Sequence, residues 1–170
     1  MDSLIELMNK LLAETYMLSL KAHSFHWNVE DPMFPMYHDF FGEYYDEVYG
    51  AVDKVAEEIR ALDGMPINAP SKMLEASSIK EAAAGMIPAT VMVRILSEDN
   101  AKITSTLNQT FNAATKSNQQ GLANYISERL DAHQKHAWMF RAMLKRAGAT
   151  NEQVEPTEVE SKTYEITFNK

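Results

Sequence analysis

Four long stretches of the chain carry apolar residues at every third or fourth position, and this periodicity restricts the fold more than any other feature. Each stretch predicts a helix with one apolar face. The first starts near Ser3, the second follows Asp31, the third covers 88–116 and the fourth runs from Gly121 to Gly148. Such helices are stable when their apolar faces pack together, so the sequence predicts an all-α four-helix bundle. In chain order, the four apolar stripes are Leu4, Met8, Leu11, Leu18, Ala22 and Phe25; Phe41, Tyr45, Val48, Val52, Val55, Ile59 and Leu62; Leu96, Ile103, Leu107, Phe111 and Ala114; and Leu122, Ile126, Leu130, His133, Ala137, Phe140 and Leu144.

Local signals place the ends of the first two helices. A capping-box pattern at Ser3 predicts the start of the first helix. Asp31 as a cap, followed by Pro32 at the first helical position, predicts the start of the second. We expect that helix to cover 33–62 and to end at Gly64.

The connection between the second and third long helices is the longest in the chain. Pro66 and Pro70 mark its first part as non-helical, and 71–76 predicts a short helix within it. Another capping-box pattern, at Ser78, precedes Pro88. The predicted fold is therefore a four-helix bundle with a short extra helix in the crossover between helices 2 and 3.

The composition excludes several classes of protein. None of the 170 residues is cysteine, so disulfides and thiolate metal sites are ruled out. Asp2 and Glu6 stand where a secretion signal would be basic, and no apolar run is long enough to cross a membrane. We therefore expect a cytoplasmic protein without a membrane segment. A net charge of −8 works against general attraction to nucleic acid and suits the binding of cations.

Two histidines and two carboxylates form the candidate metal site: His26, His38, Asp53 and Glu57. Neutral imidazoles and carboxylates make a ligand set that suits iron, manganese or zinc. Asp53 and Glu57 are four residues apart, so they lie on the same side of the predicted helix, beside its apolar stripe. Acidic residues at such an edge are often only solvated, but the two histidines favour a metal site.

This ligand set cannot close within one chain. His38 and Asp53 lie on the same predicted helix, separated by 53 − 38 = 15 residues. That separation is roughly 22 Å along the helix axis, whereas metal–ligand bonds are about 2 Å long. A second copy of the helix, antiparallel across a two-fold axis, would bring His38 of one chain near the carboxylates of the other, and the site would form twice. The spacing therefore predicts a metal site between subunits.

A longer residue pattern surrounds the four candidate ligands. It comprises His26, Trp27, Asn28, Val29, Pro32, Phe34, His38, Phe41, Tyr45, Asp53, Ala56 and Glu57. This pattern resembles the Dps family of mini-ferritins, and the segment 134–140 is similar to the last helix of that family. The resemblance covers about residues 3–147. Asp31 replaces the usual Gly of the family and Glu58 replaces the usual Arg, but neither change removes a ligand.

The resemblance implies a ferritin-like bundle that assembles into a dodecameric shell with one ferroxidase site per subunit. His26 and His38 would come from one chain, and Asp53 and Glu57 from its partner. The implied function is oxidation of Fe2+, generally with hydrogen peroxide in preference to oxygen, and storage of Fe3+ inside the shell, which protects against oxidative stress. Iron is the implied metal, and Zn2+ is an alternative occupant of the same site.

A DNA-condensing structural protein with little ferroxidase role is the alternative function. Family members that bind DNA directly usually use a tail rich in Lys and Arg. The first twenty residues contain Lys10 against Asp2, Glu6 and Glu14, and the C-terminal tail is also acidic. Direct DNA binding is therefore disfavoured, and a gel shift with a steep salt dependence would be the evidence for it.

Four other side chains could take part in a metal site. His133 and His136 are three residues apart, but His133 falls on an apolar stripe and no Glu-x-x-His motif is present, so we expect a packed or hydrogen-bonded role. The missing motif also excludes a di-iron centre inside one bundle. His23 is either an outer neighbour of His26 or a partly exposed helix residue. Trp27 either packs, which is the role we expect, or shields the site or acts as a nearby redox-active ring.

The end of the chain gives two further expectations. Family members often line an iron-entry pore with acids near the start of the last helix, and Glu128 and Asp131 are the candidates here. The residues 149–170 form an acidic extension beyond a domain that covers 1–148. The segment 163–168 alternates enough to form a short strand.

Overall fold

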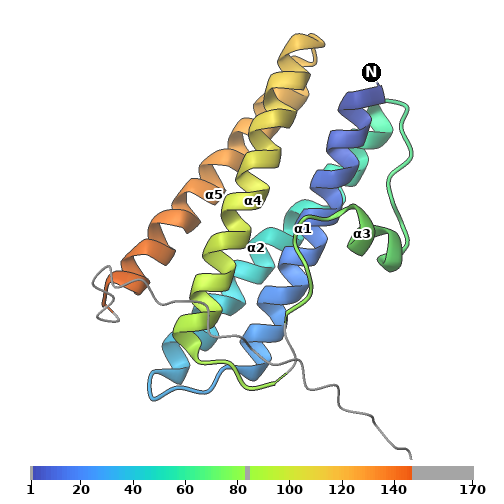
Figure 1. The fold of residues 1–170 in the computed structure, drawn as a ribbon. Coiled ribbons are helices and arrows are strands. Elements are labelled where there is room, and N and C mark those ends of the chain that lie inside the picture. The colour runs from blue at the N-terminus through green and yellow to red at the C-terminus, as the bar shows by residue number, and fades with distance from the viewer. Residues whose placement is uncertain (1, 83–84, 147–170) are drawn as a thin grey trace, which may run out of the picture.

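The computed structural model describes residues 2–82 and 85–146. Its helices are α1 (Asp2–Asn28), α2 (Phe34–Ala61), α3 (Pro70–Ala76), α4 (Ala89–Lys116) and α5 (Gln120–Arg146). Figure 1 shows the short α3 lying outside the bundle of long helices. The prediction of an all-α four-helix bundle with a helix in the crossover is confirmed, and no strand occurs in the described ranges. The predicted helix end at Gly148, the extension 149–170 and the strand at 163–168 lie outside them.

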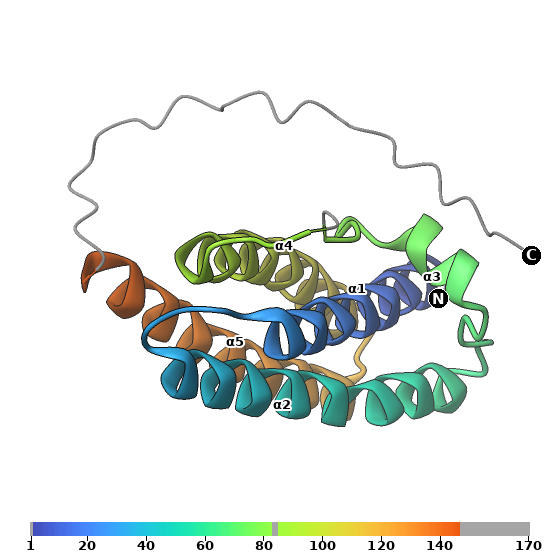
Figure 2. The ribbon, with the colours of Figure 1, turned by 90° about the horizontal axis from the view of Figure 1, so that it is seen from below.

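The apolar stripes of the sequence meet in one core. α1 packs against α2 and α4, and α4 packs against α5; Figure 2 shows α1 lying between α4 and α2. All predicted stripe residues of α1 are buried, and the largest buried side chains include Phe25, Phe41 and Phe140. Burying one side chain of this size stabilises the fold by about 1.5–3 kcal/mol. In α2, however, Tyr45 and Val52 are only half-buried, so a single chain does not cover the whole stripe.

The crossover is attached to α1 by three hydrogen bonds. The side-chain amide of Asn9 donates to the Met65 carbonyl oxygen at 3.2 Å and accepts from the Ile67 amide at 2.8 Å. The hydroxyl of Ser78 donates to Glu14 Oε1 at 2.7 Å. The capping-box prediction at Ser78 is therefore wrong, because no helix begins there and its hydroxyl serves a tertiary contact instead.

The predicted cap of α2 is also wrong, because Pro32 does not begin the helix and its first residue is Phe34. The Asp31 carboxylate accepts from the Met33 amide at 2.8 Å, and the Asp31 carbonyl oxygen accepts from the Phe34 amide at 2.9 Å. These bonds close a turn that contains Pro32, and the helix begins after it, with Pro35 in its first turn. The carboxylate thus caps a turn before the helix. The short connection places the start of α2 beside the end of α1.

The backbone is left-handed two residues beyond the last residue of α2 and of α4. Asp63 has φ 60° and Asn118 has φ 58°. The following amides reach back five residues, from Gly64 to the Ile59 carbonyl oxygen and from Gln119 to that of Ala114, both at 2.9 Å. Gly64 does mark the helix end, but for lack of space: a Cβ there would lie 2.9 Å from the Cγ2 atoms of Ile5 and Ile59. Gly121, where the fourth helix is expected to start, is the second residue of α5.

Candidate metal centre

His26 and His38 come together where α1 turns into α2. His26 lies in the last turn of α1 and His38 in the first turns of α2, and both are half-buried. Their rings stack with centroids 3.7 Å apart and an angle of 23° between the planes. The structure therefore brings together the two histidines of the predicted ligand set.

Each of the two rings donates a hydrogen bond to the backbone of the other residue. His26 Nδ1 lies 2.7 Å from the His38 carbonyl oxygen, and His38 Nδ1 lies 2.9 Å from the His26 carbonyl oxygen. A carbonyl oxygen only accepts, so each Nδ1 carries the proton. In a neutral imidazole the other nitrogen, Nε2, then has a free lone pair. Backbone bonds of this kind fix the ring orientation and tautomer of metal-binding histidines.

Aromatic side chains surround the histidine pair. Phe34 stacks on His38 with centroids 4.9 Å apart, and the edge of Tyr45 meets His26 at 5.4 Å. The ring of His23 lies 6.2 Å from that of His26, which makes it an outer neighbour, and stacks on Tyr45 at 4.0 Å. Trp27 contacts His23 but is 61% exposed, so the prediction that Trp27 packs into the fold is wrong for the single chain.

The two carboxylates of the predicted set lie elsewhere on the same helix. Asp53 and Glu57 are exposed on α2, more than four helical turns beyond His38. Within the described residues, no three His, Asp or Glu side chains are grouped closely enough to hold a metal ion. Within a single chain the candidate ligands therefore form two separate groups, an imidazole half-site and a carboxylate half-site of the predicted metal centre.

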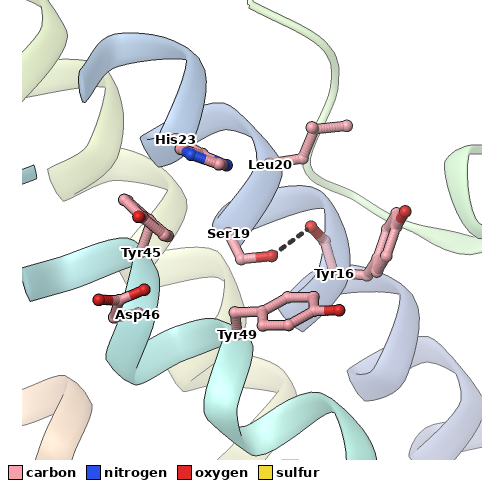
Figure 3. A pocket seen from close by; sticks show the side chains of 7 residues that line it. All are labelled: Tyr16, Ser19, Leu20, His23, Tyr45, Asp46 and Tyr49. Atoms are coloured by element: carbon pink, nitrogen blue, oxygen red, sulfur yellow. Dashed lines mark hydrogen bonds between the residues drawn. The ribbon is translucent and has the colours of Figure 1, made fainter. Parts of the chain in front are cut away.

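A pocket lies between the two half-sites, where α1 and α2 face each other. It has a volume of about 410 Å³ and is lined by Tyr16, Ser19, Leu20, His23, Tyr45, Asp46 and Tyr49. Figure 3 shows the α1 and α2 side chains on either side of the opening, with the Ser19 hydroxyl bonded to the Tyr16 carbonyl oxygen at 2.8 Å. Leu20 and Tyr49 are 47% and 59% exposed. Two large side chains are therefore exposed beside this hollow on the surface of α1 and α2.

His133 and His136 belong to a polar network inside the bundle. His133 is buried; its Nδ1 donates to Asn100 Oδ1 at 2.7 Å, and Arg129 approaches its Nε2 at 3.5 Å. Arg129 also pairs with Glu47 of α2. The expected hydrogen-bonded role of His133 is what the structure shows. The hydrogen-bond partners in this network were not predicted, because they lie on three different helices. The available signal in the sequence was the presence of polar residues on apolar stripes.

The buried histidines make stability depend on pH. Burial first, and then the charges of Arg129 and His136, hold the pKa of His133 well below its usual range. Burial also lowers the pKa of His136, against the opposing effect of Glu47. At neutral pH the folded state therefore keeps both rings neutral, whereas the unfolded chain takes up protons more readily below about pH 6.5.

We expect the free energy of unfolding of the metal-free protein to fall as the pH drops below about 6.5, by up to about 1.4 kcal/mol per pH unit for each buried histidine. The stabilisation is fully present above that pH and is lost progressively below it. Urea unfolding between about pH 5 and 7.5 measures the slope. His133→Gln should give a shallower slope, and an unchanged slope would show that His133 is protonated in the folded state.

Four long helices with a long crossover between the second and third are the architecture of a ferritin-like protein. The sequence model of the ferritin-like domain matches residues 5–148. None of the described helices has the length and apolar character needed to cross a membrane.

Comparison with known proteins identifies the family within the ferritin-like class. The chain is 35% identical over 142 residues to DNA protection during starvation protein 2 of Bacillus anthracis, covering 84% of this chain and 97% of that protein. It is 30% identical over 145 residues to an uncharacterized low temperature-induced protein of Nostoc sp., covering 85% and 81%. The crystal structure of Dps from Staphylococcus aureus superposes with a TM-score of 0.81 at 32% identity, covering 85% and 96%. The chain belongs to the Dps family of ferritin-like proteins, which confirms the resemblance seen around His26.

Proposed function

We propose that the protein is a ferroxidase and iron-storage mini-ferritin that oxidises Fe2+ between two copies of the chain. His26 and His38 of one copy, with Asp53 and Glu57 of the other, would bind the Fe2+ substrate. One observation carries the proposal: the hydrogen bonds of the histidine pair leave both Nε2 lone pairs free, while no further donor in the described part of the chain completes the site.

The positions of the half-sites define how two copies would meet. If α2 of a second copy runs antiparallel, residues that face each other across the two-fold axis have residue numbers with a constant sum. Residue 38 facing residue 53 gives a sum of 91, and residue 38 facing residue 57 gives a sum of 95. Residues near half these sums, 46 and 47, then lie closest to the two-fold axis. A two-fold contact of this kind completes two equivalent sites at once.

The surface at this predicted axis supports the pairing. The pocket between α1 and α2 includes Tyr45, Asp46 and Tyr49, so it lies at the centre of the proposed contact. The exposed side chains of Leu20 and Tyr49 and the half-buried Val52 would lose contact with water there. Burial of such apolar area is the main favourable contribution to stable subunit association.

The donor set suits the chemistry of iron oxidation. Two neutral imidazoles and two carboxylates bind Fe2+ without net charge, and the carboxylates favour the more highly charged Fe3+ product. Four ligands leave coordination positions open for the oxidant. Hydrogen peroxide, the oxidant we propose, takes one electron from each of two Fe2+ ions and yields water or hydroxide. Storage of the Fe3+ product requires a closed shell, for which we propose twelve copies, with Glu128 and Asp131 at the entry pore.

Iron binding and oxidation by the wild-type protein test the proposal directly. Anomalous diffraction from a crystal soaked anaerobically in Fe2+ should place iron between the histidine pair of one copy and the carboxylates of another. Stopped-flow absorption should show faster oxidation with hydrogen peroxide than with oxygen. Sedimentation should give a particle of about 230 kDa, from twelve chains of 19.2 kDa. Iron bound instead at His133 and His136, or a monomer, would contradict the proposal.

A further inference from the structure

Gly42 lies against the ring of His26, and we infer that it is a positioning residue that allows His26 to take its metal-binding orientation. A Cβ atom at position 42 would lie 3.2 Å from both Nδ1 and Cε1 of His26. Contacts between heavy atoms are favourable at about 3.5–4.0 Å, so even one methyl group would press on the ring. The inference rests on the proposed function, because it concerns the imidazole half-site.

The hydrogen bond of His26 explains why position 42 has no room. His26 Nδ1 donates to the carbonyl oxygen of His38 at 2.7 Å. In an α-helix the carbonyl of residue 38 points along the axis toward residue 42. A donor that approaches this carbonyl from the side must therefore pass over residue 42. Glycine is needed at that position for close approach to the helix backbone.

The ring cannot move away from a methyl group at position 42 without loss. It is stacked on the ring of His38 at 3.7 Å, and His38 Nδ1 is itself bonded to the His26 carbonyl oxygen at 2.9 Å. Tyr45 lies against the ring of His26 at 5.4 Å. A shift of a few tenths of an ångström would lengthen the 2.7 Å bond or tilt the stack. Either change weakens the hydrogen bond that keeps the proton on Nδ1 and alters the direction of the Nε2 lone pair.

α2 provides a matched control for this substitution. Gly50 lies on the same helix, and a Cβ built there meets nothing within 4 Å. Replacing either glycine by alanine raises helix propensity by the same amount. Gly121 of α5 has the same open surroundings and lies away from the α1–α2 pocket, so it controls for effects on the proposed subunit contact. Gly42→Ala thus differs from both controls in that its added methyl group meets the ring of His26.

The first experiment measures binding of Zn2+ alone to the assembled, iron-free protein by calorimetry. Gly42→Ala should weaken binding by about 10- to 100-fold, the usual effect of losing an outer partner of a metal ligand. The visible absorption of bound Co2+ should change in the same variant, because the ligand geometry changes. Gly50→Ala and Gly121→Ala should bind Zn2+ like the wild type. Equal affinity of all four proteins would overturn the inference.

A second experiment needs no metal and separates the contact from the proposed function. Thermal melting is compared for Gly42→Ala and Gly50→Ala, each in the wild-type and the His26→Ala background. Gly42→Ala should melt lower than Gly50→Ala when His26 is present and at the same temperature when it is absent. The same difference in both backgrounds would show that position 42 does not act through His26. A wild-type protein that binds no Zn2+ would overturn the role in metal binding and the proposed function together.

Discussion

Replacing Asp53 by Asn and Glu57 by Gln together is expected to slow Fe2+ oxidation by more than about 100-fold, because losing even an outer partner of a metal ligand costs 10- to 100-fold. The amides keep the size of the carboxylates but bring no negative charge to the metal. Both side chains are exposed on α2, so the fold should be unaffected. Stopped-flow oxidation of Fe2+ by hydrogen peroxide measures the rate, and circular dichroism measures the helix content.

A control variant separates the site from the overall charge. Asp2 and Glu6 are also an exposed acidic pair four residues apart, on α1. Asp2→Asn with Glu6→Gln removes the same two charges, so general attraction of Fe2+ to the protein changes equally in both double variants. The control should oxidise iron at the wild-type rate. Unchanged oxidation in the Asp53 and Glu57 variant would remove these residues from the site.

Two inactive variants are expected to restore activity when their chains assemble together. One chain carries His26→Ala and His38→Ala, and the other carries Asp53→Asn and Glu57→Gln. A mixed two-fold pair then has one intact site, made of the histidines of the second chain and the carboxylates of the first. Random pairing makes half of the pairs mixed, so about one quarter of the wild-type sites should be recovered.

Co-expression with two different affinity tags makes this measurement possible. Purification on both tags selects particles that contain both chains, and Zn2+ calorimetry then counts the sites. Each variant expressed alone should have none. The result distinguishes a site between subunits from one within a chain, because ligands from the same chain would never be complete in either variant. A mixed particle without any recovered site would therefore exclude the proposed arrangement.

The helical fold of this protein could be predicted from periodicity alone. The stripe from Leu4 to Phe25 is buried throughout, and the short helix predicted at 71–76 is α3. These features are local: a period of three or four residues and a proline near a helix start act within one or two turns. The distance between His38 and Asp53 also follows from local structure, because a helix has a fixed rise per residue. That distance predicted that the candidate ligands of one chain form two half-sites.

Features that depend on a second element could not be predicted. Ser78 has a capping-box pattern, but its hydroxyl bonds to Glu14 on α1. The helix ends at Asp63 and Asn118 use left-handed backbone at residues that sequence signals did not single out. In each case the packing of the chain set a contact or a backbone conformation, and this outweighed the weak conformational preference of the local sequence.

The sequence by itself determined the four helices, and it predicted the ligand types and the need for a second copy of the chain. Only the tertiary structure decided how the histidines are held: their mutual backbone bonds and the bare surface of Gly42 arise because α1 and α2 meet at one turn. It also decided that Arg129 pairs with Glu47 and His133 with Asn100. A hydrogen bond between residues far apart in sequence has no periodic signal, since its geometry exists only after the helices have packed.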